Sequence, residues 1–325
     1  MEQKEKIPVL AVVGPTASGK TSLAVALAHA LDGEVISCDS MQIYQTMDIA
    51  TAKPDEQEMD GIPHHLIGFL PPDQPFSLAE YVRLAGEAIK DVAGRGKLPI
   101  LAGGTGLYAD TLLRGVKLSD SGEDPAYRAE LQALAEKEGG EKLREMLLAC
   151  DPDYAAGVHA HNIPRLIRAL EVYHATGIPL SVHIARSREG GTPYRPFWLG
   201  INYRDRSVLY DRINARVDQM MERGLLEEAR AAYASRMKTA AQAIGCKELF
   251  PYFAGEKSLS DCVETLKQST RRYAKRQLTW FRRNPDIHWL YPDELGKEGL
   301  LAEALRLVKA ESGFYRNVNS HPDAL

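Results

Sequence analysis

The segment "VLAVVGPTASGKTSLAVALAHAL" (9–31) constrains the fold of this chain more than any other. An apolar, β-branched run leads directly into the pattern G-x-x-x-x-G-K-[ST], which is matched by Gly14, Gly19, Lys20 and Thr21, and then into residues with helical apolar spacing. In that order, the backbone N–H groups of the loop surround a phosphate, Lys20 adds positive charge, and the Thr21 hydroxyl can hold Mg²⁺. The segment predicts a phosphate-binding loop between a buried strand and a helix.

Strand and helix patterns alternate along much of the remaining sequence. The segment 77–94 has helical spacing, and Ser77 with Glu80 forms a capping-box pattern at its start. Further strands are predicted at 34–39, 64–70, 98–104, 197–203 and 286–291. This alternation predicts an α/β fold, with a P-loop-containing open parallel sheet flanked by helices.

The pattern changes near residue 116, where long helical stretches replace the alternation. These stretches break at Gly139 and Gly140, and a helix over 162–177 is closed by Gly177. The segment 190–196 has the composition of an exit loop. We therefore predict a P-loop catalytic core formed by 1–115 and 196–311, an all-helical insertion domain at 116–195, and a flexible tail at 312–325.

Composition excludes several classes of protein. Apolar residues make up 44% and charged residues 26%, which is typical of a soluble globular protein, and the formal net charge of −4 argues against a uniformly basic nucleic-acid binder. No apolar run approaches the ~20 residues that span a bilayer. The cysteines are too widely spaced to indicate a zinc site or a disulfide framework: Cys38, Cys150, Cys246 and Cys262. We expect a cytoplasmic protein with no membrane partner.

One acidic residue is missing where an ATPase or GTPase of this fold usually has one. Those enzymes carry an Asp at the end of a second apolar strand, whereas the strand at 98–104 ends in "GGTG". Asp39 instead lies at the tip of the strand at 34–39, and the tips of parallel strands flank the ligand crevice. Asp39 is therefore a candidate metal ligand or general base, with a turn cap as the structural alternative. Thr105, at the tip of the other strand, offers a hydroxyl to the same crevice.

A basic segment lies between residues 267 and 283. It contains seven bases and no acid: Lys267, Arg271, Arg272, Lys275, Arg276, Arg282 and Arg283. On a helix, Arg272, Lys275 and Arg276 share one face. A solvated basic face is the ordinary explanation of such a run, but in a chain with net negative charge it also suits a polyanion with several phosphates. The predicted insertion adds further arginines, and the pattern favours a large anionic substrate.

Several motifs together resemble one family. They are "GPTASGKT", "CDSMQIYQTMDIATAKP", "GIPHHLI", "FSLAEY", "GGTGLY", "PRLIRALEV", "AIGCKEL" and "TRRYAKRQLTWFR". In this order they resemble the tRNA dimethylallyltransferases over about residues 8 to 291. The resemblance implies that the five-carbon group of dimethylallyl diphosphate passes to N6 of the adenosine 3′-adjacent to the anticodon, with release of diphosphate. The sequence departs from the family pattern at Ala50, Ile163 and Cys246.

The resemblance also implies roles for particular residues. Asp39 is expected to be the general base, with Lys20 and Thr105 completing the catalytic set. The diphosphate is expected to contact Gly14, Thr16, Ala17, Ser18, Gly19, Lys20, Thr21 and Arg216, with Mg²⁺ at Thr21. The tRNA is expected to contact Asp39, Ser40, Met41, Gln42, Thr105, Arg128, Arg165, Gln242 and Lys247, together with the basic residues Arg272, Lys275 and Arg276. The expected partners are the tRNA anticodon stem-loop and dimethylallyl diphosphate, and the protein is expected to be a monomer.

Three other functions remain open from the sequence. A nucleotide kinase uses the same loop, but it has no need of a basic helix at 267–283. A prenyltransferase acting on free adenine nucleotides shares the catalytic core and has less need of the insertion. A non-enzymatic RNA-binding module does not account for the intact loop beside Asp39.

Overall fold

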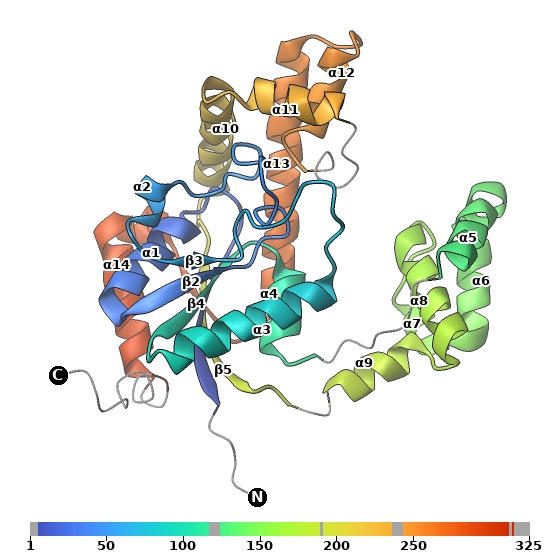
Figure 1. Cartoon of the computed structure of the whole chain (residues 1–325), viewed down its shortest axis with the longest axis horizontal. Coiled ribbons are helices and arrows are strands. Elements are labelled where there is room, and N and C mark those ends of the chain that lie inside the picture. The colour runs from blue at the N-terminus through green and yellow to red at the C-terminus, as the bar shows by residue number, and fades with distance from the viewer. Residues whose placement is uncertain (1–5, 117–123, 189–190, 236–242, 312–313, 315–325) are drawn as a thin grey trace, which may run out of the picture. The chain divides into compact units, whose positions relative to one another are not determined.

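The structure, a computed structural model, describes residues 6–116, 124–188, 191–235, 243–311 and 314 (Figure 1). Its centre is a six-stranded sheet in the order β3-β2-β4-β1-β5-β6, and all neighbouring strands are parallel. The strands are β1 (Ile7–Val13), β2 (Gly33–Ser37), β3 (His64–His65), β4 (Leu98–Gly103), β5 (Tyr194–Ile201) and β6 (Ile287–Leu290). The predicted α/β class with an open parallel sheet is confirmed.

The chain divides into two compact units. One consists of Met1–Leu113 with Pro193–Leu325 and contains the sheet, and the other is Arg114–Thr192. The helices of the first unit are α1 (Lys20–Leu31), α2 (Glu56–Met59), α3 (Leu78–Gly94), α4 (Gly106–Leu113), α10 (Arg206–Glu222), α11 (Leu225–Ala234), the 3₁₀ helix η2 (Lys247–Leu249), α12 (Phe250–Phe253), α13 (Leu259–Phe281) and α14 (Pro292–Ala310). The described part of the second unit is built from α5 (Pro125–Glu138), α6 (Gly140–Cys150), α7 (Pro152–Ala156), α8 (Ile163–Thr176) and α9 (Leu180–Arg188).

The two faces of the sheet carry separate cores because side chains alternate along each strand. On one face, Leu10 of β1 belongs to a cluster with Leu27 of α1 and Ala304 of α14. On the other face, Ala11 belongs to a cluster with Tyr81 of α3 and with α4. Each fully buried leucine or isoleucine in these clusters contributes about 1.5–3 kcal/mol. The sheet is therefore fixed from both sides, and the tips of its strands have a rigid support.

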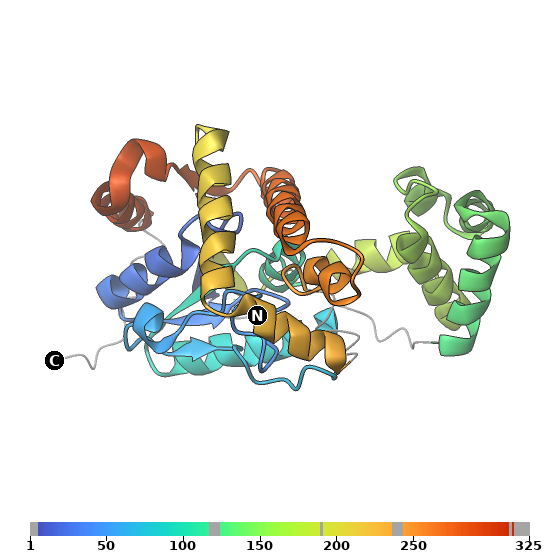
Figure 2. The same ribbon diagram turned by 90° about the horizontal axis from the view of Figure 1, so that it is seen from above.

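A third group of helices lies beyond the carboxyl ends of the strands. Helices α10 and α13 lie side by side, and α11 and α12 pack near their ends (Figures 1 and 2). Their shared core includes Val217 of α10, Leu225 of α11 and Leu266 of α13, together with Ile43 and Met47 from the segment after β2. The segment after β2 is therefore enclosed by helices that come from the other end of the sequence.

Several helix ends match the sequence patterns. At the start of α3, Glu80 N–H donates to Ser77 Oγ at 3.1 Å and Ser77 N–H donates to the Glu80 carboxylate at 2.9 Å, which confirms the capping box. Helix α5 ends before Gly139, and α8 is closed by Gly177 with φ 66°. Glycine suits that end because the left-handed conformation costs it no steric clash.

Two predicted boundaries are wrong. The strand predicted at 64–70 stops at His65, because Leu66 takes a left-handed conformation with φ 62° and turns the chain away from β2. The exit loop predicted at 190–196 is partly strand, because β5 begins at Tyr194, which pairs with Ile7 of β1. Pro196 is tolerated there because β6 pairs only with the later residues of β5, from Trp198 onwards.

Most of the predicted tail, 312–325, lies outside the described residues. Phe314 is described, and its side chain is buried with its ring 5.6 Å from the ring of Phe197. This residue therefore packs on the core. None of the helices in the described ranges is long and apolar enough to cross a membrane.

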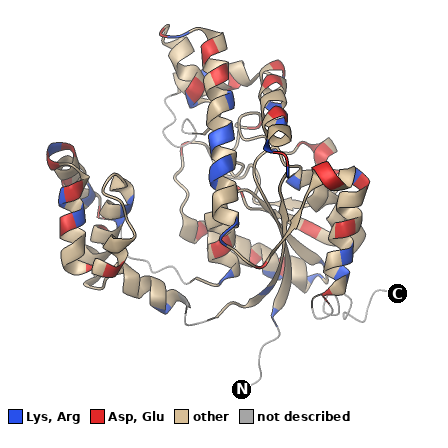
Figure 3. Cartoon of the chain, turned by 180° about the vertical axis from the view of Figure 1, so that it is seen from behind, with Lys and Arg blue, Asp and Glu red and all other residues tan. Residues whose placement is uncertain are grey.

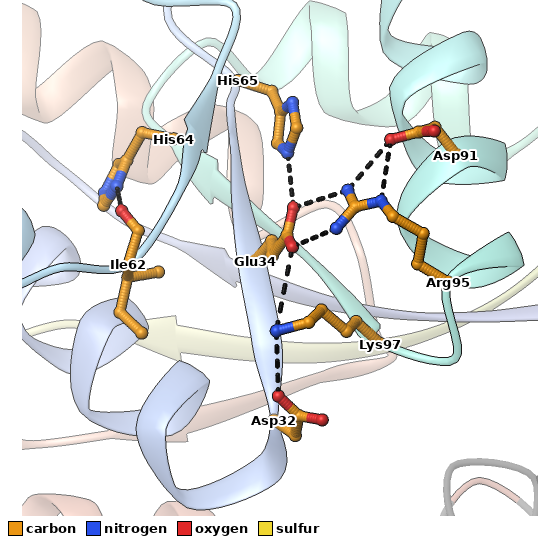
Figure 4. Close-up of polar contacts among 8 residues, drawn as sticks. All are labelled: Asp32, Glu34, Ile62, His64, His65, Asp91, Arg95 and Lys97. Atoms are coloured by element: carbon orange, nitrogen blue, oxygen red, sulfur yellow. Dashed lines mark hydrogen bonds and ion pairs between the residues drawn. The ribbon is translucent and has the colours of Figure 1, made fainter. Parts of the chain in front are cut away.

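A buried carboxylate ties the amino-terminal end of β2 to its surroundings (Figure 4). Glu34 is 2% exposed and accepts two hydrogen bonds from the Arg95 guanidinium, one of them at 2.7 Å. His65 Nε2 lies 2.8 Å from the same carboxylate, and Lys97 Nζ lies 3.9 Å away. The Arg95 hydrogen bonds, followed by His65, lower the pKa of Glu34 to about 2. This cluster joins β2, β3 and the start of β4 at the end of β2 opposite to Asp39.

Candidate active site

The loop between β1 and α1 has the backbone of a phosphate cradle. Gly14 has φ 150°, and a Cβ there would lie 2.6 Å from the carbonyl oxygen of Ile201. Gly19 has φ 93° and is the N-cap of α1, while Ala17 is also left-handed with φ 61°. The glycines of the motif are thus required by backbone geometry, and the loop delivers its N–H groups to the start of a helix, where an anion is favoured.

Lys20 lies at that helix start. Its Nζ donates a hydrogen bond to the carbonyl of Pro15 at 2.6 Å. Burial, together with the nearby charge of Arg216, lowers the pKa of Lys20 to about 7, while Asp39 acts in the opposite direction. Burial also lowers the pKa of Arg216. An anion bound between these two side chains would favour the charged form of Lys20.

The tips of β2 and β4 are joined by hydrogen bonds around Asp39. Asp39 Oδ1 accepts the N–H of Met41 at 2.9 Å, so one carboxylate oxygen caps the turn. The Ser40 N–H donates to Thr105 Oγ1 at 3.1 Å, and the Thr105 N–H donates to the carbonyl of Cys38 at 3.1 Å. The capping interpretation and the functional interpretation of Asp39 are therefore compatible, because Asp39 also lines a cavity.

The glycines of "GGTG" are explained by two close approaches. A Cβ on Gly103 would lie 2.0 Å from the carbonyl oxygen of Cys38, and one on Gly104 would lie 2.1 Å from Nε2 of Gln277. The Gln277 amide donates to the carbonyl of Gly104 at 3.0 Å and accepts the N–H of Thr16 at 2.8 Å. Helix α13 thus contacts both the phosphate loop and the turn that carries Thr105.

A cavity of about 340 Å³ brings many of the predicted residues together. The predicted residues that line it are Thr16, Lys20, Thr21, Asp39, Ser40, Met41, Gln42, Arg216, Lys247 and Arg276. A second cavity, of about 330 Å³, is lined by Ala17, Ser18 and Gly19 and also by Arg212 and Arg223. Both cavities share three polar residues, Lys20, Thr21 and Arg216, and two apolar ones, Ala52 and Met220. The phosphate loop therefore faces two adjoining spaces, one of which contains Asp39.

Tyr273 is a cavity residue that the sequence interpretation missed. It lines the cavity that contains Asp39, and burial raises the pKa of its hydroxyl. The Arg276 guanidinium lies 5.6 Å from its ring centroid. One signal in the sequence could have indicated it: Tyr273 lies one turn before Gln277 within the basic segment, so both side chains leave the same face of α13.

Two exposed basic residues of α13, Arg272 and Lys275, do not line the cavity, whereas the exposed Arg276 does. Within the described residues, Arg272 and Lys275 form no ion pair with an acid. Figure 3 marks the Lys and Arg residues of α13 in blue. Lys267, by contrast, pairs with Asp218 at 2.7 Å, and Arg271 donates to Asn214. Among the seven bases of the segment, Lys267 and Arg271 therefore contact α10, whereas Arg272 and Lys275 are exposed and could contact a ligand.

The remaining predicted contacts lie in the second unit or outside the described residues. Arg128 donates two hydrogen bonds to the buried carboxylate of Glu171, at 2.7 and 2.8 Å, which orients its half-exposed guanidinium. Arg165 is exposed in the first turn of α8. Gln242 lies outside the described residues. The described residues contain no group of three or more His, Cys, Asp or Glu side chains placed to hold a metal ion.

Comparison with known proteins gives a consistent family. A model described as "IPP transferase" matches residues 42–284, and one described as "Isopentenyl transferase" matches residues 7–67. The tRNA dimethylallyltransferase of Geobacillus thermodenitrificans is 50% identical over 287 residues, covering 88% of this chain and 90% of the relative. That of Bacillus subtilis is 48% identical over 286 residues, covering 87% and 90%.

Solved structures agree with this family. The tRNA isopentenylpyrophosphate transferase of Bacillus halodurans matches with a TM-score of 0.72 and 42% identity, covering 96% of this chain and 98% of that one. A eukaryotic dimethylallyltransferase acting on tRNA matches with a TM-score of 0.82 and 31% identity, covering 95% of this chain and 80% of that one. Because the first family model spans most of the chain and the relatives match along nearly their whole length, the chain belongs to the IPP transferase family, the family of the tRNA dimethylallyltransferases.

Proposed function

We propose that the protein transfers the dimethylallyl group of dimethylallyl diphosphate to N6 of the adenosine 3′-adjacent to the anticodon of tRNA. The observation that carries this proposal is that Asp39 and the phosphate loop line one cavity, next to the basic helix α13. A carboxylate facing a phosphate cradle suits a reaction in which a proton leaves a nucleophile while a diphosphate departs.

The bond changes follow from this placement. A C–N bond forms between N6 and the first carbon of the dimethylallyl group, and the bond from that carbon to the diphosphate oxygen breaks, with its electron pair leaving on diphosphate. One N6 proton passes to the carboxylate of Asp39, which offsets the weak nucleophilicity of an amine conjugated with the ring. Tyr273, which lines the cavity with Asp39, and Thr105, whose hydroxyl accepts the N–H of Ser40, would orient the adenine.

The leaving diphosphate needs positive charge around it. The loop N–H groups, Lys20 and Arg216 supply it from protein groups that line both cavities. The donor set also fits Mg²⁺, because the Thr21 hydroxyl and diphosphate oxygens are hard oxygen ligands, and Mg²⁺ in phosphate sites commonly keeps several waters. Bound there, Mg²⁺ would neutralise part of the charge that develops on the leaving group.

The RNA would reach the cavity along α13. Arg272, Lys275 and Arg276 share one face of this helix, and Arg276 also lines the cavity. We extend the proposal to the second unit, where Arg128 and Arg165 would contact the anticodon stem-loop. The adenine must leave its stack to reach Asp39, which costs least in a single-stranded loop. The monomeric state and the cytoplasmic location stay predictions.

The test is a substrate comparison with one preparation of the protein. Labelled dimethylallyl diphosphate is offered with tRNA, with AMP, or with AMP and unlabelled ATP. The proposal predicts label in tRNA alone, at the N6 position of one adenosine. Label in AMP but not in tRNA would indicate a prenyltransferase acting on free nucleotides, and phosphate transfer from ATP would indicate a kinase.

A further inference from the structure

The segment 48–52 forms a wall that both active-site cavities share. Ala50 and Thr51 line the cavity that contains Asp39, whereas Asp48 and Ile49 line the other one. Ala52 lines both cavities. A displacement of this short segment would therefore change the shape of both spaces at the point where they adjoin.

One carboxylate holds the backbone of this segment from outside the cavities. The N–H groups of Asp48 and Ile49 each donate to Glu228 Oε2 at 2.9 Å, and the N–H of Ala50 donates to Glu228 Oε1 at 2.8 Å. Three consecutive N–H groups thus converge on one anionic side chain from α11. Hydrogen bonds to a charged acceptor are the strong ones, so this contact fixes the segment firmly.

The segment needs such support because its backbone is strained. Ala52, the last residue of the segment, and Thr46, which precedes it, are left-handed, with φ 49° and 58°, although neither is glycine. Such conformations persist only where surrounding contacts impose them. Gln42, which precedes the segment, donates from Nε2 to the carbonyls of Thr51 and Ala52, at 3.3 and 3.1 Å. Glu228 supplies the matching contact to the N–H groups, from a helix 180 residues away in sequence.

The backbone at Gly245 packs closely against Ala50 of the segment 48–52. A Cβ on Gly245 would lie 3.0 Å from Cβ of Ala50 and 3.2 Å from its Cα. The N–H of Gly245 donates to the buried carboxylate of Glu248 at 3.0 Å. There is little room for the segment 48–52 to move toward Gly245, and the hydrogen bonds to Glu228 and from Gln42 hold it in this position.

We infer that Glu228 is a positioning residue for prenyl transfer, which sets the width of the passage between the two cavities and so selects a five-carbon chain. The inference rests on the proposed function. Five residues line both cavities. Lys20, Thr21 and Arg216 are polar and suit a diphosphate, whereas Ala52 and Met220 are apolar and suit the hydrocarbon chain attached to the diphosphate. Ala52 is placed by the segment that Glu228 holds, whereas Met220 lies on the regular helix α10.

The variant that tests this is Glu228→Gln, with Glu227→Gln as the matched control. Glutamine keeps the size of the side chain but presents an NH₂ group to a backbone N–H. Glu227 precedes Glu228 on α11 and is exposed. With saturating tRNA, kcat and KM are measured for dimethylallyl diphosphate and for the ten-carbon geranyl diphosphate. The ratio of the two kcat/KM values is independent of the fraction of folded protein, so a loss of stability alone does not move it.

For Glu228→Gln we expect KM for dimethylallyl diphosphate to rise about tenfold, as for loss of a charged hydrogen bond. The kcat/KM ratio of geranyl to dimethylallyl diphosphate should rise by about threefold or more, because a loosened wall admits the longer chain. Glu227→Gln should change neither value. The inference is overturned if Glu228→Gln keeps the wild-type KM and ratio, or if Glu227→Gln changes them equally.

Amide hydrogen exchange tests the same contact without any transfer activity. In the intact protein, peptides that cover 48–52 should exchange faster in Glu228→Gln than in wild type or in Glu227→Gln. Equal exchange in all three proteins would contradict the inference. If wild type transfers no dimethylallyl group, the proposed function fails; if wild type is active and Glu228→Gln behaves like it, only this inference fails.

Discussion

The side-chain amide of Gln277 accepts the N–H of Thr16 at 2.8 Å, which ties α13 directly to the phosphate loop. The other end of the same amide donates to the carbonyl of Gly104 at 3.0 Å. A primary amide carries an acceptor oxygen and a donor nitrogen side by side, so it satisfies both backbone groups at once. One buried side chain therefore aligns the diphosphate side of the site with the turn that carries Thr105, and it does so from the helix that also presents the exposed bases.

Replacing this amide should weaken both the fold and the site. In Gln277→Met the Thr16 N–H and the Gly104 carbonyl lose their partner, and we expect the free energy of unfolding to fall by about 1–3 kcal/mol. KM for dimethylallyl diphosphate should rise as well, because the loop N–H groups lose alignment. Urea unfolding and steady-state kinetics measure the two effects. Gln268→Met, at an exposed position of α13, is the control and should change neither.

Asp39→Asn should separate catalysis from binding. Asparagine retains the carbonyl oxygen that accepts the Met41 N–H, so the turn is preserved, but it cannot take a proton from N6. We expect kcat to fall about 10²–10⁴-fold with little change in tRNA affinity. Single-turnover transfer and a tRNA binding assay give the two values. If affinity and turnover fall together, Asp39 acts as a binding residue.

The exposed bases of α13 should control the salt dependence of tRNA binding. Replacing Arg272, Lys275 and Arg276 by glutamine removes up to three phosphate contacts. The slope of the logarithm of the tRNA binding constant against the logarithm of the salt concentration should therefore become less negative by roughly 2. Binding titrations at several salt concentrations measure this slope. Lys309→Gln, which removes an exposed base from α14, should leave it unchanged. A triple variant with the wild-type slope would show that the tRNA does not follow α13.

Diphosphate binding should be coupled to proton uptake by Lys20. Burial, reinforced by Arg216, lowers the pKa of Lys20 to about 7, so above that pH the free protein holds a neutral amine more often than a charged one. A bound anion favours the charged form, and we expect proton uptake on binding at pH 8 that declines by pH 6. Calorimetry in buffers of different ionisation enthalpy measures it. In Lys20→Arg the side chain stays charged at both pH values. This variant should therefore lack the extra proton uptake that wild type shows at pH 8.

The Glu34 cluster should make stability depend on acid pH. Hydrogen bonds from Arg95, with His65, lower the folded-state pKa of Glu34 to about 2, below its unfolded value. Its stabilisation is therefore full above the unfolded pKa and is lost as the pH falls toward 2. Glu34→Gln should destabilise the protein by about 1–3 kcal/mol at pH 7, and this difference should shrink as the pH falls below about 4. Urea unfolding at several pH values measures it, and a constant difference would contradict the assignment.

Local patterns predicted those parts of the molecule that neighbouring residues determine. The loop at Gly14 to Thr21, the alternation of strands and helices, and the caps at Ser77 and Gly177 are set by backbone geometry and by spacing within a few residues. The end of β3 was missed because Leu66 adopts a left-handed conformation that tertiary contacts impose and that strand propensity does not indicate.

Contacts between distant residues were beyond such patterns. Gln277 and Thr16 are 261 residues apart, and Glu228 and Asp48 are 180 apart, so neither pair leaves a periodic signal in the sequence. Tyr273 was missed, because its place in the cavity that contains Asp39 depends on how α13 packs across the strand tips. Side chains that position the site through the fold were therefore found only in the structure.

The most direct test of the proposed reaction follows carbon and phosphorus together. Dimethylallyl diphosphate labelled in its carbon chain and in both phosphates is incubated with the protein and tRNA, and the products are separated. We expect labelled carbon to enter tRNA at N6 of one adenosine and both phosphates to leave together as diphosphate, and we expect Asp39→Asn to suppress the transfer. Labelled phosphorus in the RNA, or carbon transfer unaffected by Asp39→Asn, would contradict it.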